Sequence, residues 1–290
     1  MIWASLATAT RVSYARKIQE FVVFRKQQRL ADAWPLPVDH LMRFIIALRD
    51  RDLSARLIAV YLAALSFQAR ALDWVDSTSD FRIRRMLEGL RRSCPRPIDA
   101  RQLVIPGMLK ALCADFDSLC TSRYEALLFK ACCQVLFFGA FRPSEVLSIS
   151  KFKPGDRALR WGDCVLGANH VSLFLRHSKT DQRGKGQWVH LKRSATVEIC
   201  PVQAIVAYRR VAPQGAGPLF RHENASPLTI YQFRAVFHAA LRGRSLAPDR
   251  FGLHSFRIGA ASTAARLGFP AGAIKKIGRW RSGAFRYYVR

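Results

Sequence analysis

Acidic residues are scarce in this sequence. It contains 20 Asp and Glu residues against 47 Lys and Arg residues, which gives a formal net charge of +27 at pH 7. The basic residues run through both halves and are mixed with periodic apolar segments, so they do not form a disordered basic tail. One explanation is a solvated cationic surface. A folded protein with this charge more often binds a polyanion, most commonly nucleic acid, and we favour that interpretation.

The number and spacing of the cysteines do not fit a disulfide scaffold. The chain has 7 cysteines, an odd number, and no CxxC pair. Cys132 and Cys133 are adjacent inside an apolar run. This pattern argues against a disulfide framework and against a zinc ribbon. We therefore expect reduced cysteines that lie mostly in the core, an intracellular protein, and no metal site.

Long hydrophobic runs are also missing. The longest, around residues 131–140, is too short to span a bilayer. The N-terminal segment MIWASLATATRVSYAR is too weakly apolar for a signal peptide. No internal repeat and no low-complexity tract is present. A membrane partner is therefore not expected.

The chain nevertheless has enough apolar residues for a substantial core. It has 290 residues, 50% of them hydrophobic, which favours two domains over one. The first ninety or so residues carry helical spacing, best seen at Leu41, Phe44, Ile45 and Leu48. Ser54 is a candidate N-cap for the next helix. The other expected helices carry Tyr14, Ile18 and Phe21; Leu57, Tyr61 and Leu65; and Ile83, Leu87 and Leu90.

The expected helix after Ser79 is basic on the face opposite its apolar residues. This face is either solvated or in contact with phosphate groups, and the net charge of +27 favours phosphate contact. The candidate DNA-binding residues on it are Arg82, Arg84, Arg85, Arg91 and Arg92.

A Cys-Pro-Arg-Pro segment at residues 94–97 interrupts the helical pattern. We place a linker at 94–102 there, between a helical domain at 1–93 and a second domain at 103–290. Helices are expected at about 106–118 and 122–140. The second of these is nearly all apolar and should be the buried centre of the larger domain.

The pattern changes from helix to strand between residues 157 and 192. Val171, Leu173 and Leu175 alternate with other residues, and residues 188–192 alternate in the same way. Between them, residues 178–186 are rich in turn formers and basic residues. This predicts a small antiparallel sheet with a long basic hairpin loop, on which Arg183 and Lys185 are further candidates for DNA contact.

Helices are expected again after Cys200-Pro201. Thr229 is a candidate N-cap for a helix that carries Phe233, Val236, Phe237 and Leu241. Residues 254–290 are expected to form three short helices, broken at 268–270 and near 280–282. The predicted fold class is therefore mostly α with a small antiparallel β-sheet.

Three short motifs carry residues suited to phosphate chemistry. They are RPSE at 142–145, HSFR at 254–257, and GRW at 278–280 followed by Tyr287-Tyr288. An arginine presents a planar fork of donors that matches two phosphate oxygens. Taken singly, each motif has an ordinary explanation, such as a surface ion pair at a helix end or a structural histidine.

Together, and in this order, the motifs resemble the catalytic domain of the tyrosine recombinase (phage integrase) family. The sub-pattern GRW followed by SGAF and a tyrosine resembles the recombinases of DIRS-type retroelements and Crypton-type elements. The resemblance covers about 103–290. It extends more loosely to the helical N-terminal half, which looks like the family's core-binding domain. It implies a C-shaped clamp around double-stranded DNA.

The resemblance also implies roles for individual residues. Arg142 and Arg257 would hold the two non-bridging oxygens of one phosphodiester and stabilise the charge of the transition state. Glu145 would orient Arg142, and His254 would hydrogen-bond the phosphate or help to move a proton. Lys179, on the hairpin loop, would protonate the departing 5′ oxygen. Lys185 is the competing candidate for this acid.

The nucleophile implied by the family is Tyr288 or Tyr287. The family's tyrosine lies nine residues after a His or Trp that follows a glycine, and this spacing favours Tyr288. The His/Trp position itself holds Arg279, with Trp280 one residue later, so either residue is a candidate for its role. Many relatives continue well beyond this tyrosine, whereas this sequence has two further residues, which leaves the mode of assembly open.

The expected activity is cleavage and rejoining of DNA through a 3′-phosphotyrosine, without metal, cofactor or small-molecule substrate. Recombination by this route would need two duplexes and a homo-tetramer. The retroelement resemblance implies integration of a mobile element and a nuclear location. Two rivals remain: a domesticated, catalytically inactive DNA-binding protein, and a type IB topoisomerase. An RNA-binding protein lacks support because no aromatic RNP-like signature is present.

Overall fold

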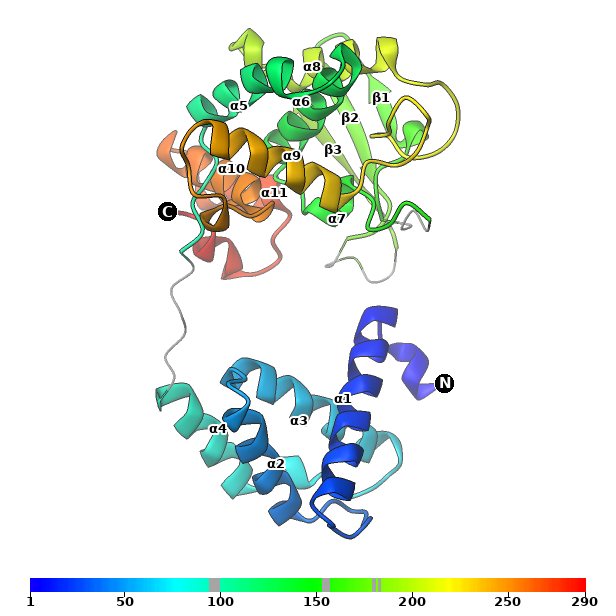
Figure 1. The fold of residues 1–290 in the computed structure, drawn as a ribbon, viewed down its shortest axis with the longest axis vertical. Coiled ribbons are helices and arrows are strands. Elements are labelled where there is room, and N and C mark those ends of the chain that lie inside the picture. The colour runs from blue at the N-terminus through cyan, green and yellow to red at the C-terminus, as the bar shows by residue number, and fades with distance from the viewer. Residues whose placement is uncertain (94–99, 153–156, 179–180, 182–183) are drawn as a thin grey trace. The chain divides into compact units, whose positions relative to one another are not determined.

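The computed structural model describes residues 1–93, 100–152, 157–178, 181 and 184–290 (Figure 1). The contacts within the chain divide it into two compact units, Met1–Asp99 and Ala100–Arg290. Each unit has its own hydrophobic core. In the described part of the chain, no helix combines the length and the apolar character needed to cross a bilayer.

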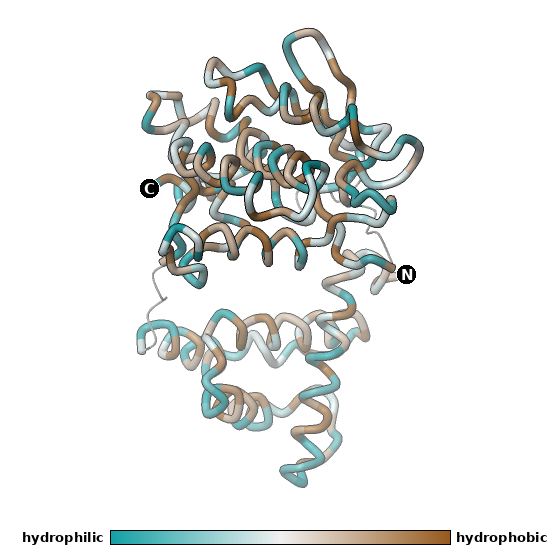
Figure 2. Tube along the Cα trace, turned by 45° about the horizontal axis from the view of Figure 1, so that its top comes forward, coloured by the Kyte–Doolittle hydropathy of each residue, from teal (hydrophilic) through white to brown (hydrophobic). Residues whose placement is uncertain are grey.

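The first unit is helical. The predicted apolar face at Leu41, Phe44, Ile45 and Leu48 is buried in its core. Hydrophobic and hydrophilic residues alternate along the helices (Figure 2), as expected of helices that bury one face. The elements are the 3-10 helix η1 (Ile2–Ser5), α1 (Thr8–Gln27), α2 (Val38–Asp50), α3 (Ala55–Ala71), the 3-10 helix η2 (Ser77–Ser79) and α4 (Phe81–Ser93).

Helix α3 begins where its cap predicts. The Ser54 hydroxyl accepts a hydrogen bond from the Leu57 amide at 3.3 Å, which satisfies one of the donors at the helix start. Tyr61 and Leu65 are buried as predicted, but Leu57 is 40% exposed, so placing it on the apolar face was wrong. The reason is geometric: residues four apart on a helix drift by about 40° per step, so three such positions do not share one line.

The second unit combines helices with a small sheet. Its α-helices are α5 (Pro106–Leu119), α6 (Arg123–Phe138), α7 (Pro143–Val146), α8 (Pro201–Val211), α9 (Ile230–Gly243), α10 (His254–Arg266) and α11 (Ala271–Gly278). Its 3-10 helices are η3 (Trp161–Asp163), η4 (Val197–Ile199), η5 (Pro248–Arg250) and η6 (Gly283–Tyr287). The Thr229 hydroxyl accepts from the Gln232 amide at 3.2 Å, which confirms the predicted N-cap of α9.

The sheet has three antiparallel strands, β1 (Cys164–Leu166), β2 (His170–Leu175) and β3 (Gln187–Lys192), in that order. Val171 pairs with Leu191, and both side chains are buried. His190 and Lys192 point to the opposite, exposed face. The predicted alternation along β3 is therefore confirmed, and the fold class is mostly α with a small antiparallel sheet.

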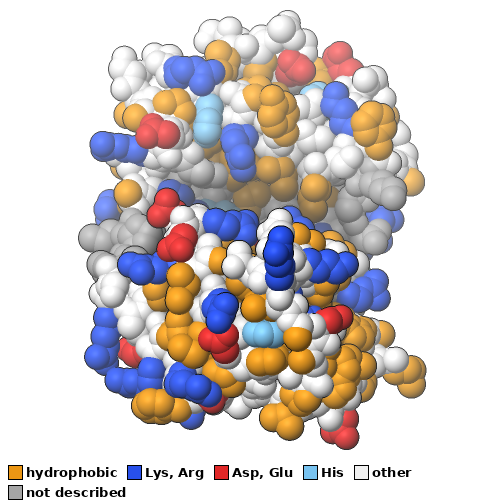
Figure 3. All heavy atoms as spheres, turned by 60° about the horizontal axis from the view of Figure 1, so that its bottom comes forward, with side chains coloured by type: hydrophobic (Ala, Val, Ile, Leu, Met, Phe, Trp, Pro, Cys, Tyr) orange, Lys and Arg blue, Asp and Glu red, His pale blue; other side chains and the backbone are white. Residues whose placement is uncertain are grey.

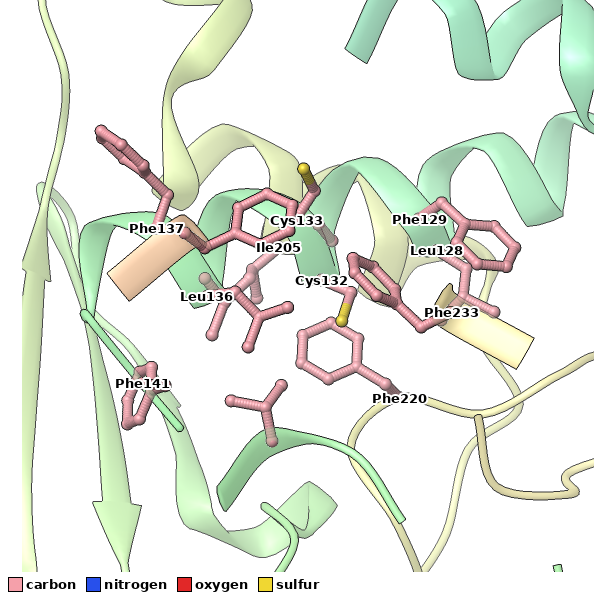
Figure 4. Close-up of a cluster of buried hydrophobic side chains, with 14 of the residues drawn as sticks. Leu128, Phe129, Cys132, Cys133, Leu136, Phe137, Phe141, Ile205, Phe220 and Phe233 are labelled. Carbon is pink, nitrogen blue, oxygen red and sulfur yellow. The ribbon is translucent and has the colours of Figure 1, made fainter. Parts of the chain in front are cut away.

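Helix α6 is the centre of the larger core, as its apolar sequence predicted. Cys132, Cys133 and Leu136 on this helix are fully buried. Cys132 and Leu136 point into a cluster with side chains of α8 and α9, whereas Cys133 points to the other side of the helix (Figure 4) and interacts with Cys113 of α5. Burial raises the pKa of both thiols well above its usual value, because the charged thiolate is unfavourable there. Such burial stabilises the fold by about 1.5–3 kcal/mol for a large apolar side chain.

The C-terminal stretch follows the prediction in part. Helices α10 and α11 are separated by Gly268, which has a φ of +77° that suits glycine, and by Pro270, which precedes α11. The third expected helix is the 3-10 helix η6. After α11, Trp280 and Phe285 form a small apolar cluster with Ala261 and Ala264 of α10.

Candidate active site

The site begins at the C-terminal end of α6. Gly139 caps this helix, and a Cβ added there would lie 2.1 Å from the Phe141 ring, so the close turn requires glycine. Ala140 follows with a φ of +41°. The carbonyl groups at this end carry the partial negative charge of a helix C-terminus. The turn therefore presents acceptors to any cation that packs against it.

Arg142 and Glu145 form a compact pair directly after this turn. The carboxylate of Glu145 accepts from the backbone amide of Arg142 at 2.8 Å and from its guanidinium at 2.8 Å. The side chain of Glu145 is only 3% exposed, whereas that of Arg142 is 17% exposed. Of the two, Arg142 is therefore the one that can still reach an external anion.

Arg257, in the first turns of α10, is fully buried. Its terminal nitrogens donate to the carbonyl oxygens of Ala140 and Gly278, and its Nε atom has no partner among the described residues. Burial, followed by the positive charges of Arg142 and Arg279, lowers the pKa of Arg257. Burial of this cation is therefore unfavourable, and its buried Nε–H group remains as a donor without a partner among the described residues.

Arg279 occupies the end of α11 in a left-handed conformation, with a φ of +55°. Its guanidinium donates to the Gly139 carbonyl at 2.8 Å and to the Glu145 carboxylate at 3.1 Å. It also lies 4.6 Å from the centre of the Phe141 ring. Burial lowers the pKa of Arg279, and Glu145 opposes that effect. The side chain therefore points inward, toward the α6 turn.

Trp280 and Tyr288 cover Arg257. The Arg257 guanidinium lies 4.3 Å from the centre of the Trp280 ring and 5.5 Å from the centre of the Tyr288 ring. The two rings are 5.0 Å apart and inclined at 48°. Tyr287, by contrast, is 77% exposed and belongs to none of these contacts. The structure therefore brings Tyr288 beside Arg257.

The remaining predicted residues are placed less completely. His254 is the first residue of α10 and is half-buried, three residues before Arg257. Lys179 and Arg183 lie outside the described residues.

Lys185 is exposed, and its amide donates to the Asp181 carboxylate at 3.2 Å. Backbone hydrogen bonds, first that of Gly186, and the charge of Arg281 lower the pKa of Asp181. The described part of the hairpin loop is thus within electrostatic reach of the residue after Trp280.

The basic residues of α4 are exposed, but they differ in their partners. Arg82 pairs with Asp80 at 3.1 Å, and Arg91 and Arg92 pair with Glu88 at 3.5 and 3.2 Å. The other two, Arg84 and Arg85, have no carboxylate within ion-pair distance in the described part of the chain. Lys and Arg side chains are spread across the face of the molecule in Figure 3.

Sequence reasoning named Arg142, Arg257 and Arg279 as candidates but did not predict how they interact. It gave no sign that Arg257 and Arg279 share the carbonyl groups at the end of α6. It also passed over Ser262, whose buried hydroxyl contacts the Tyr288 segment. The only hint was the position of Ser262 on the same predicted helix as Arg257. Among the described residues, no group of three or more His, Cys, Asp or Glu side chains is placed to hold a metal ion.

The chain has a relative among curated proteins, although no protein-family model matches it. This relative, an integrase/recombinase XerD homolog from Selenomonas ruminantium, is 25% identical over 294 aligned positions, which cover 96% of this chain and 80% of that protein. The chain is therefore similar in sequence to an integrase/recombinase over nearly its whole length.

Solved structures of recombinases and integrases share the fold. XerH site-specific recombinase, bound to palindromic difH substrate in a post-cleavage complex, matches with a TM-score of 0.68 at 15% identity, over 96% of this chain and 75% of XerH. A lambda integrase dimer bound to a COC′ core site matches with a TM-score of 0.63 at 13% identity, over 98% of this chain and 72% of that one. The Tn1549 transposon integrase in complex with transposon right end DNA matches with a TM-score of 0.66 at 13% identity, over 100% of this chain and 93% of that one.

Proposed function

We propose that this protein is a site-specific tyrosine recombinase that cuts and rejoins double-stranded DNA. The observation that carries the proposal is the position of Tyr288, whose ring lies 5.5 Å from the guanidinium of the buried Arg257. A phosphoryl-transfer site needs a nucleophile and a cation that meet at one phosphate.

In the proposed reaction, the Tyr288 oxygen attacks the scissile phosphorus. A bond forms between this oxygen and phosphorus, and the bond to the 5′ oxygen breaks, which leaves a 3′-phosphotyrosine and a 5′-hydroxyl. The phenol loses a proton and the 5′ oxygen gains one. We assign the gain to Lys179, with Lys185 as the alternative, and help with the loss to His254. Rejoining is the same exchange in reverse, so the phosphodiester energy is conserved.

Arg142 is the arginine best placed to receive the phosphate, because it is partly exposed and is oriented by Glu145 at 2.8 Å. Arg257 becomes available when the Trp280 and Tyr288 rings shift, and its unpartnered Nε atom offers a donor. Arg279 acts indirectly, because it donates to the Glu145 carboxylate that orients Arg142. Trp280, which touches both Arg257 and Tyr288, then takes the role of the family's His/Trp position.

We propose further that recombination joins two duplexes in a tetramer and serves a mobile element. The GRW and SGAF pattern supports this context through its resemblance to DIRS-type and Crypton-type recombinases. The fold similarity to a transposon integrase is compatible with it. A nuclear location is part of the retroelement proposal and depends on it. The helical unit at the N-terminus is proposed as the core-binding domain, with α4 along the DNA backbone.

The test is a suicide-substrate assay. Purified protein is incubated with a nicked duplex from the termini of the element, and the products are resolved on a denaturing gel beside Tyr288→Phe and Tyr287→Phe. We expect a covalent protein–DNA band that only Tyr288→Phe abolishes. A band lost only in Tyr287→Phe would overturn the choice of nucleophile. No band in any protein, with salt-sensitive DNA binding intact, would favour the inactive DNA-binding protein. Relaxation of supercoiled DNA without site preference would favour the topoisomerase.

A further inference from the structure

Ser262 connects the helix of the phosphate-binding arginine to the segment of the nucleophile. It lies on α10, five residues after Arg257, and is fully buried. Its hydroxyl donates to the Tyr288 carbonyl at 3.1 Å and accepts from the Arg290 amide at 3.0 Å. A hydroxyl has one donor and two acceptor positions, so it can make both bonds at once.

The choice of partners is unusual for a serine in the middle of a helix. Such a serine commonly bonds back to the carbonyl one turn earlier on its own helix. The Ser262 hydroxyl instead makes its hydrogen bonds with the segment that carries Tyr288. This one hydroxyl therefore holds the backbone on both sides of Val289, at the Tyr288 carbonyl and at the Arg290 amide.

Other contacts hold the same segment less directly, among them a hydrogen bond from the long, flexible side chain of Arg290 to the Arg101 carbonyl. The Tyr288 amide donates to the Phe285 carbonyl at 2.8 Å, a bond within the segment itself. Val289 packs against the small apolar cluster of Trp280 and Phe285. Apolar packing is not directional, so these contacts tolerate a small slide. A pair of hydrogen bonds from one buried atom does not tolerate it, because the geometry of each bond is narrow.

We propose that Ser262 is a positioning residue that sets the register of Tyr288 relative to Arg257. This inference rests on the proposed function and deepens it. Attack on phosphorus requires the nucleophile to be held near its final geometry, and a misplacement of about 1 Å can cost roughly 100-fold in rate. Since α10 carries Ser262, Arg257 and His254, one rigid helix would fix the nucleophile, the cation and the histidine together.

The experiment compares Ser262→Ala and Ser262→Thr with a matched control, Ser172→Ala. Ser172 is also a buried serine of this unit, and its hydroxyl lies 2.8 Å from His190 Nδ1 on the sheet. Two readouts are used. One is the single-turnover rate of covalent adduct formation on the suicide substrate at saturating protein. The other is amide hydrogen exchange of residues 283–290, followed by mass spectrometry without DNA.

We expect Ser262→Ala to bind the duplex like the wild type but to form adduct about 10- to 100-fold more slowly. Amide exchange in 283–290 should rise by roughly 5-fold at the Arg290 amide, the effect of removing its hydrogen bond to Ser262. Ser262→Thr keeps the hydroxyl and should restore both readouts, and Ser172→Ala should change neither. Adduct formation within twofold of wild type in Ser262→Ala would overturn the proposal.

The two readouts separate this proposal from the proposed function. If the wild type forms no adduct, the proposed function fails. The exchange data still decide whether Ser262 holds the segment. Unchanged exchange in Ser262→Ala would overturn the positioning role even where the wild type is active. Equal slowing of adduct formation in Ser262→Ala and Ser172→Ala would also overturn it, because a general loss of stability would explain both.

Discussion

The carboxylate of Glu145 accepts a hydrogen bond from the guanidinium of Arg279 at 3.1 Å, although the two residues are 134 positions apart in the chain. Both side chains are at most 4% exposed. The same carboxylate also binds Arg142, and its charge favours the ionised form of Arg257. One buried anion therefore serves a cluster of three arginines, which would otherwise repel one another.

Glu145→Gln should destabilise the second unit strongly. Removing one partner of a buried ion pair leaves an uncompensated charge and costs about 3–5 kcal/mol. Differential scanning calorimetry is the appropriate measurement, because the two units can unfold in separate transitions. The control is Glu88→Gln on α4, whose side chain is 38% exposed; a surface pair is worth about 0–1 kcal/mol. Equal, small shifts in the two variants would contradict the role of Glu145.

The same cluster shows how far the sequence alone could predict the site. The caps at Ser54 and Thr229 were predictable because their chemistry involves only the next few residues. The sheet was predictable because strand alternation is also local. The shared use of the Ala140 carbonyl by Arg257 and Arg279 was not, because it depends on packing between residues more than a hundred positions apart. Motif order could suggest proximity, but not which atoms meet.

DNA affinity should fall steeply with salt, and the basic residues of α4 should contribute unequally. Arg84→Ala with Arg85→Ala should lower the slope of log K against log salt by about 0.9 for each phosphate that is no longer neutralised. The matched variant is Arg91→Ala with Arg92→Ala, which removes the same charge. Its effect should be smaller, because Glu88 already neutralises part of that charge. Fluorescence anisotropy between 50 and 200 mM salt, a range of about fourfold, measures both slopes. Identical slopes in the two variants would contradict phosphate contact by Arg84 and Arg85.

Stability of the second unit should fall at alkaline pH because of Tyr208. This residue is fully buried, and its hydroxyl is bonded to the Leu219 carbonyl at 3.0 Å. Burial raises the pKa of Tyr208 above its usual value. Its contribution is therefore present below the unfolded pKa of about 10 and is lost as the pH rises above it, with a slope of roughly 1.4 kcal/mol per pH unit.

The alkaline effect is measured by urea unfolding between about pH 9 and pH 11, bracketing the usual tyrosine pKa. Tyr208→Phe should be less stable at neutral pH but should lose stability less steeply over this range. Tyr231→Phe is the control, because Tyr231 is 79% exposed and should leave the wild-type slope unchanged. A Tyr208→Phe slope as steep as the wild type would mean that other groups cause the alkaline loss.

Trp280 should be needed for cleavage more than for DNA binding, because it lies on Arg257 at 4.3 Å and on Tyr288 at 5.0 Å. Trp280→Phe keeps an aromatic face and should weaken the cation contact by about 0.5–1 kcal/mol, leaving most adduct formation intact. Trp280→Ala removes the surface that both groups share and should abolish adduct formation while duplex binding persists. Loss of a large core side chain costs about 3–5 kcal/mol, so both variants are assayed well below their calorimetric midpoints. Adduct formation at the wild-type rate by folded Trp280→Ala would show that the ring does not organise Arg257 and Tyr288, and the role assigned to Trp280 would then pass to Arg279.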